Sequence, residues 1–164
     1  MTKLASVLED KGWVLRSGGA SGADSAFEAG IKDRANMEVF LPSTFFNGKR
    51  ALDKGYADST KLASFPEALE TVNKYHPAPH KLSGFPKILM ARNAMQVLGP
   101  DLNSPSQLVI AWTNGGKMVG GTSQAIRIAT DLKIPVLNLG CPGKSAELEK
   151  WLDSPSDSPL DMLY

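Results

Sequence analysis

The sequence contains one cysteine, Cys141, and two histidines in 164 residues. One cysteine excludes a disulfide within the chain, and a structural zinc site needs more cysteine and histidine ligands than are available. The histidines, His76 and His80, flank prolines that prevent a helix from placing both side chains on one face. We therefore expect no metal site, and no motif predicts a bound cofactor.

A surplus of charge of one sign is also missing, because 18 lysines and arginines face 17 aspartates and glutamates. This balance argues against binding to nucleic acid or to a membrane surface through bulk charge. No apolar run approaches the roughly 18 residues of a membrane span, and Glu9 and Asp10 interrupt the first apolar segment. We expect a cytoplasmic protein with no membrane partner.

The remaining composition, 42% apolar and 21% charged, is typical of one globular domain. At this length a folded chain buries roughly 70% of the surface that its unfolded form exposes, so an ordinary apolar core suffices. We assign residues 1–152 to a single domain and residues 153–164 to a polar C-terminal tail.

Short apolar segments alternate with segments of helical period. The expected strands are 13–16, 37–41, 106–112 and 134–139, and the expected helices are 3–11, 23–31, 60–75 with a kink at Pro66, 85–98, 122–132 and 146–152. Residues 43–59 show no clear period and are expected to be a loop that covers a binding site. This alternation predicts an α/β fold, namely a Rossmann-like open parallel sheet with helices on both faces.

Two glycine-rich turns each lead from an expected strand into an expected helix. The first, residues 17–24, reads SGGASGAD, and the second, residues 114–123, reads NGGKMVGGTS. Glycines allow close approach to a phosphate, and a helix N-terminus offers unpaired N–H groups and a partial positive charge. Each turn alone is equally consistent with a simple capped connection, but a flavodoxin-like strand order would place both beside one ligand.

Three side chains near these turns have two interpretations each. Asp24 fits a capping pattern with Ser21, or it faces the ligand as a ribose hydroxyl acceptor or general base. Arg92 lies in an apolar helical stripe, where it extends to solvent or holds a phosphate with its planar fork. Asn93 is expected to hold a loop or the edge of a base.

The order of these motifs resembles one superfamily. Its members include the Rossmann domain of DNA-processing protein A (DprA) and the lysine-decarboxylase-like, cytokinin-activating LOG enzymes (together, SLOG-type proteins). The resemblance rests on SGGASGAD, the Met90-Ala91-Arg92-Asn93 segment, SQLVIAW, GGTSQAIRIA and IPVLNL, and covers roughly residues 12–140. It is closest to small single-domain DprA-like proteins of bacteria and their phages, which implies the host cytoplasm if the protein is phage-encoded.

The resemblance implies that a nucleotide or nucleotide-derived molecule binds at the paired turns. The protein would sense or sequester a nucleotide signal. The expected ligand-binding and phosphate-binding residues are Ser17, Gly18, Gly19, Ala20, Ser21, Gly22, Asp24, Arg92, Asn93, Gly120, Gly121, Thr122 and Ser123.

Whether the protein is an enzyme stays open from the sequence. LOG enzymes are phosphoribohydrolases that cleave the N-glycosidic bond of a nucleoside monophosphate with a glutamate in the second turn. Ala125 stands where that glutamate would be, which favours binding over catalysis. The alternative is a nucleotide N-glycosidase in which Asp24 or Glu28 supplies the carboxylate.

A weaker alternative follows from the DprA members, which bind single-stranded DNA. Lys49, Arg50 and Lys54 with nearby aromatic residues would form such an interface, although the near-neutral net charge argues against single-stranded nucleic acid as the partner. The resemblance also implies self-association, so a homodimer is a further expectation.

Overall fold

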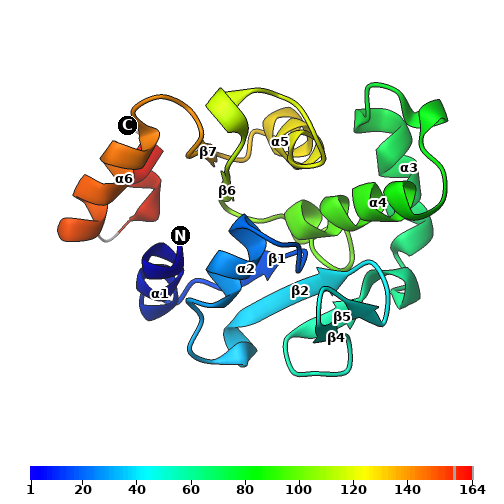
Figure 1. Ribbon diagram of the computed structural model, residues 1–164, viewed down its shortest axis with the longest axis horizontal. Helices are drawn as coiled ribbons and strands as arrows, with labels where there is room; N and C mark the ends of the chain where they lie inside the picture. Colours follow the sequence, from blue (N-terminus) through cyan, green and yellow to red (C-terminus); the bar gives the residue numbers. More distant parts are fainter. Residues whose placement is uncertain (157, 164) are drawn as a thin grey trace.

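The computed structural model describes residues 1–156 and 158–163 and shows a mixed α/β protein (Figure 1). The helices are α1 (Thr2–Asp10), α2 (Ala23–Glu28), α3 (Phe65–Tyr75), α4 (Gly84–Leu98), α5 (Thr122–Asp131) and α6 (Lys144–Asp153). The strands are β1 (Leu15–Ser17), β2 (Met37–Leu41), β3 (Phe45–Phe46), β4 (Lys49–Arg50), β5 (Tyr56–Asp58), β6 (Val109–Ala111) and β7 (Val136–Asn138). Short 3₁₀ turns cover Arg34–Asn36, Ser59–Lys61, Pro79–Lys81, Asn114–Gly116 and Pro159–Leu163.

The strands form three small sheets. A parallel sheet has the order β1-β2-β5, a second parallel sheet pairs β6 with β7, and β3 and β4 form an antiparallel hairpin. The α/β class and the parallel pairing are therefore confirmed, and the single open Rossmann-like sheet stays a prediction. The first sheet also differs from the flavodoxin-like order, because β2 lies between β1 and β5 rather than at an edge.

Helices pack on both faces of the parallel sheets. Buried residues of α3, α4 and α5 form one core together with Phe40 of β2. Buried residues of α1, α2 and α6 form a second core with Leu137 of β7, and Leu15 and Ile110 pack against it. Each core therefore includes parts of both parallel sheets.

The sequence of β2 explains its central position. Met37, Val39 and Leu41 point to one face, while Phe40 points to the opposite face and joins the α4 core. Because strand side chains alternate between the two faces of a sheet, the apolar side chains of this strand are all buried only when helices or loops cover both faces. The predicted strand 37–41 is confirmed at both ends.

Residues 43–59 are not the irregular loop that we expected. Asn47 and Gly48 both have positive φ, 51° and 74°, and link β3 to β4. An Asn-Gly pair between two short strands is the typical signal of a two-residue hairpin. The same segment also supplies β5, which pairs in parallel with β2.

Several other expected boundaries differ from the structure. The expected helix 60–75 with a kink at Pro66 is wrong, because α3 begins at Phe65 and Pro66 lies in its first turn, where no N–H is needed. The expected strand 13–16 is β1, Leu15–Ser17.

α2 ends at Glu28 rather than at residue 31, and β6 covers only Val109–Ala111 of the expected strand 106–112. The region that we assigned to a polar tail starts inside α6, which ends at Asp153. Farther on, Leu163 packs against the core that contains α1 and α6.

Candidate functional site

A cleft of about 1060 Å³ lies between β1 and β6, the facing strands of the two parallel sheets. No backbone hydrogen bond joins these strands within the part of the chain that the structure describes. Helix α4 contributes Arg92, Asn93 and Gln96 to the lining, and α1 contributes Leu8. Residues from both predicted glycine-rich turns line the same cleft: Ser17, Ala20, Ser21, Gly22, Asp24, Gly121 and Thr122.

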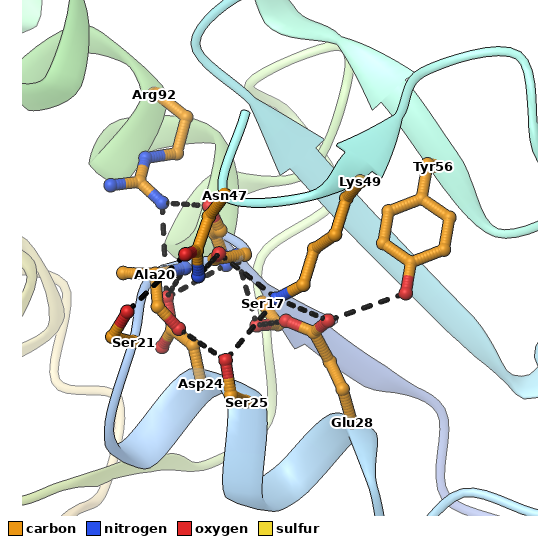
Figure 2. A network of polar contacts seen from close by, with 12 residues as sticks. Ser17, Ala20, Ser21, Asp24, Ser25, Glu28, Asn47, Lys49, Tyr56 and Arg92 are labelled. Carbon is orange, nitrogen blue, oxygen red and sulfur yellow. Dashed lines mark hydrogen bonds and ion pairs between the residues drawn. The ribbon is translucent and has the colours of Figure 1, made fainter. Parts of the chain in front are cut away.

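The first turn is organised around the carboxylate of Asp24 (Figure 2). Asp24 Oδ2 accepts hydrogen bonds from the backbone N–H of Gly18 at 3.2 Å and of Ala20 at 3.1 Å. The capping interpretation of Asp24 is thus wrong, because the carboxylate bonds to residues 18 and 20, while the Ser21 hydroxyl is directed at Asn47. Helix α2 begins after Gly22 without a side-chain cap.

The β3–β4 hairpin holds the same turn from the other side. Asn47 Nδ2 and Lys49 Nζ both donate to the carbonyl oxygen of Gly19, at 3.1 and 2.9 Å. The Lys49 ammonium also lies 2.8 Å from the carboxylate of Glu28. Figure 2 shows Lys49 reaching from the hairpin to the turn and to α2.

Glu28 lies behind the first turn, where it is buried among polar partners. Its carboxylate accepts hydrogen bonds from Ser17 Oγ at 2.7 Å and from the hydroxyl of Tyr56 at 3.4 Å. Burial and the nearby Glu28 charge raise the pKa of Tyr56, so the phenol stays protonated and remains a donor. Glu28 is therefore fully engaged in holding β1, the hairpin and β5 to α2.

Arg92 connects α4 to the first turn. Its side chain is only 7% exposed, its Nη1 donates to the carbonyl oxygen of Gly18, and the same nitrogen lies 3.8 Å from Asp24 Oδ2. Burial lowers the pKa of the guanidinium, and the carboxylates of Asp24 and Glu28 oppose that shift. Nε of Arg92 has no hydrogen-bond partner among the described residues, and Figure 2 shows one terminal nitrogen directed away from the network.

Asn93, the next residue of α4, holds the second turn. Its Nδ2 donates to the carbonyl oxygen of Gly121 at 3.1 Å, which confirms the prediction that Asn93 holds a loop. Gly121 and the exposed Thr122 face the cleft at the N-terminus of α5, which has no side-chain cap. The two turns are therefore held by adjacent residues of one helix.

The other predicted ligand-binding residues lie farther from the cleft. The Ser123 side chain is buried, and its hydroxyl donates to the Gly120 carbonyl oxygen at 2.6 Å and accepts from Arg127 at 3.2 Å. Gly18 lies directly beneath Arg92, and Gly19 packs against Leu41. Ala125 lines the cleft one helical turn after Gly121.

Trp112 is an exposed aromatic residue of the cleft lining. It follows β6, is 51% exposed and lines the cleft.

The basic residues of the weaker nucleic-acid interpretation have other partners. Lys49 is buried against Glu28, Lys54 lies 3.0 Å from Asp33, and Arg50 stacks over the ring of Phe45.

Sequence reasoning missed three contributors to this site. Asn47 and Lys49 come from a segment without clear periodicity, and their contacts to Gly19 depend on how the hairpin folds back. Gln96 lies one helical turn after Arg92, beside Gly18, and also lines the cleft. The i, i+4 spacing of Arg92 and Gln96 was a usable signal, because such residues share one helix face.

Within residues 1–156 and 158–163, no group of three or more histidine, cysteine, aspartate or glutamate side chains is arranged to hold a metal ion. No helix in the same part of the chain is long and apolar enough to cross a membrane. Comparison of the chain with known protein families, curated proteins and solved structures gave no match.

Proposed function

We propose that this protein binds a nucleotide or a nucleotide-derived small molecule in the cleft between β1 and β6, and that it senses or sequesters this molecule. One observation carries the proposal: two glycine-rich turns, far apart in the sequence, line one cleft together with the buried guanidinium of Arg92. A volume of about 1060 Å³ lies at the upper end of the range for small-molecule sites.

The chemistry of the cleft suits a ligand with separate anionic and hydroxyl-bearing parts. The guanidinium of Arg92 lines the cleft, and the N-terminus of α5 brings the positive end of its dipole and the exposed Thr122 to the same lining. Asp24, beside Arg92, supplies an acceptor, and Trp112 supplies an exposed aromatic face. Phosphate, ribose and base each have a matching group among these residues.

We further propose that the fold is Rossmann-like and that the protein belongs to the DprA/LOG superfamily. The order β5-β2-β1, followed across the cleft by β6-β7, is the order of a doubly wound sheet whose ligand crevice lies at the switch point. Pairing of β1 with β6 would complete that sheet and leave, as the ligand crevice, the part of the cleft at the carboxyl ends of these strands, beside the two turns. A glycine-rich turn follows each of these two strands, as this fold requires.

The first experiment incubates stoichiometric protein with a defined pool of nucleoside monophosphates, dinucleotides and ADP-ribose-type molecules, and then separates protein from filtrate. Mass spectrometry should find one molecule depleted from the filtrate and recovered intact from the denatured protein. Arg92→Lys keeps the charge but loses the planar fork, so we expect retention to fall by about tenfold. Undiminished retention by Arg92→Lys and Arg92→Ala would remove Arg92 from the site.

The same experiment separates binding from N-glycosidase activity. Free base and ribose phosphate in the filtrate would establish hydrolysis, with Asp24 as the first carboxylate to replace because it lines the cleft. Retention of the intact molecule supports a binding protein. A pool in which nothing is depleted or cleaved would contradict the proposal.

Ala125 provides a gain-of-function test of the superfamily assignment. It lines the cleft at the position where LOG enzymes carry their glutamate. Ala125→Glu should release base from a bound nucleoside monophosphate, while Ala125→Gln, which has nearly the same shape without the charge, should not. Equal inactivity of both variants, with ligand still bound, would argue against LOG-type chemistry in this cleft.

A further inference from the structure

The backbone N–H groups of the first turn are already occupied by an anion of the protein itself. Asp24 Oδ2 accepts from the N–H groups of Gly18 and Ala20, at 3.2 and 3.1 Å, and lies 3.8 Å from Arg92 Nη1. Convergent N–H groups beside a guanidinium are the donors that a bound phosphate uses in a glycine-rich turn. In this protein a side-chain carboxylate stands in the position of that phosphate.

We propose that Asp24 acts as a built-in anion that excludes phosphate from the first turn, so that this turn recognises hydroxyl groups of the ligand, in particular a ribose diol. This inference rests on the proposed function, because it assigns parts of the ligand to parts of the same cleft. The sequence predicts that both turns hold phosphate, and this inference leaves phosphate binding to the second turn alone. Asp24 is thereby a specificity-determining residue.

The remaining contacts of Asp24 favour recognition of hydrogen-bond donors. Oδ1 accepts no hydrogen bond from any residue that the structure describes, whereas Oδ2 has two donors. The side chain is 26% exposed and lines the cleft, so a ligand can reach it. A carboxylate only accepts hydrogen bonds, and two adjacent hydroxyl groups are suitable neutral donors.

Displacing Asp24 to admit a phosphate would be costly, because the surrounding groups fix the turn. Arg92 and Lys49 donate to the Gly18 and Gly19 carbonyl oxygens, respectively, and Asn47 also donates to Gly19. A phosphate that approached without displacing Asp24 would meet a like charge in a partly dehydrated site. Both routes disfavour an anion at this turn.

The test compares the four ribonucleoside 5′-monophosphates with their four 2′-deoxy counterparts by equilibrium binding. Wild-type protein should bind its preferred ribonucleotide at least about tenfold more tightly than the deoxy form, because a charge-assisted hydrogen bond is lost. In Asp24→Asn this ratio should fall below about threefold. The control is Asp33→Asn, which also removes a carboxylate that accepts a backbone N–H and pairs with a cation, but lies outside the cleft.

Inorganic pyrophosphate tests the exclusion directly, because it is anionic and carries no hydroxyl donor of a sugar. Asp24→Asn should bind pyrophosphate about tenfold more tightly than wild-type protein does. The reason is that the negative charge beside the N–H groups of Gly18 and Ala20 is gone. The same affinity for both proteins, at any strength, would overturn the exclusion of phosphate. Circular dichroism confirms that the variant is folded before its affinity is interpreted.

The outcomes distinguish this inference from the proposed function. Tight binding of a nucleotide with no preference between ribose and deoxyribose in the wild-type protein would overturn the role of Asp24 and leave nucleotide binding intact. That comparison needs no variant. Failure of all eight nucleotides and of the larger pool to bind would overturn the proposed function, and the inference with it.

Discussion

Both glycine-rich turns are held by side chains of α4 that bond to the main chain of the turn. Arg92 and Asn93 donate to the carbonyl oxygens of Gly18 and Gly121. In the first turn, an added Cβ at position 18 would overlap the guanidinium of Arg92, so any larger residue there has to displace the end of that side chain. The side chain of Arg92 therefore occupies the space that any larger residue at position 18 would fill.

Replacing Gly18 with alanine should displace the guanidinium of Arg92 and weaken ligand binding by at least about tenfold. We also expect a loss of roughly 1–3 kcal/mol in the free energy of unfolding, as is usual for overpacking. Urea denaturation and equilibrium binding would measure the two effects.

The matched control for this variant is Gly30→Ala. A Cβ at position 30 would lie 2.3 Å from the carbonyl oxygen of Thr2, far from Arg92, so stability should fall while the folded protein keeps its affinity. Equal loss of affinity in both variants would show that Gly18 acts only through stability.

At the scale of elements, the β3–β4 hairpin and α2 enclose a buried ion pair. The side chains of Lys49 and Glu28 are 16% and 6% exposed and lie 2.8 Å apart. Removing one partner of such a pair leaves an uncompensated buried charge, whereas removing both leaves none. The pair therefore fixes the hairpin against the first turn more than it raises overall stability.

This ion pair predicts that the effects of replacing Lys49 and Glu28 on the free energy of unfolding are strongly non-additive. Lys49→Met should lower the free energy of unfolding by about 3–5 kcal/mol, and the addition of Glu28→Gln should recover most of that loss. Chemical denaturation of the two single variants and the double variant measures the coupling. Additive effects would show that the two side chains do not interact in solution.

A second buried carboxylate, Asp58, joins β5 to the start of the hairpin segment. Its oxygens accept from Thr60 Oγ1 at 2.6 Å and from Thr44 Oγ1 at 2.8 Å. Burial alone would raise the pKa of Asp58, but these hydrogen bonds and the charge of Lys61 hold the pKa below its ordinary value.

The lowered pKa of Asp58 makes stability depend on acid pH. Its contribution is complete above the unfolded-state pKa of about 3.9 and is lost as the pH falls through the lower folded-state pKa. Asp58→Asn should therefore be clearly less stable than wild type at pH 7, with the difference shrinking below about pH 3.9. Urea midpoints measured across this range would test it, and a constant difference would contradict it.

The sequence allowed the strand 37–41 and the presence of the helices to be predicted from their apolar residues, but not the end of α2 or the start of α3. The same reasoning failed over residues 43–59, since β3 and β4 are two residues long and have no measurable period. It placed Asp24, Arg92 and Asn93 near one another through their order along the chain. It could not place Lys49 or Glu28, because their pairing depends on a hairpin that packs across the sheet.

At the scale of the whole molecule, the two parallel sheets face each other across the cleft, with α4 packed against β1 and β2, α5 packed against β6 and β7, and the two helices packed against each other. β2 has strand partners on both edges, whereas β1 and β6 each pair on one edge only. Arg16 of β1 pairs with Glu38 of the neighbouring β2 at 2.6 Å and donates to the carbonyl oxygen of Ser104, in the segment between α4 and β6.

The difference in pairing between β2 and the strands β1 and β6 predicts a pattern of hydrogen exchange. Backbone amides of β2 should exchange slowest, and those of β1 and β6 should exchange faster because one edge of each strand is unpaired. If ligand binding draws the sheets together, addition of the captured nucleotide should slow exchange in β1 and β6 and leave β2 unchanged. Equal protection of all three strands without ligand would show that the sheet is already continuous.

Because Arg92 and Asn93 are adjacent on α4, the distance between the two turns is set by the dimensions of a helix. Both hydrogen bonds are accepted by backbone carbonyl oxygens, which every residue type supplies. Side chains such as Ala20, Ser21 and Thr122 can therefore be exchanged over evolutionary time without changing how far apart the turns stand. If the cleft binds a ligand as proposed, α4 fixes the length of the ligand that fits between the turns, whereas exchange of the turn side chains changes the chemical groups that it recognises.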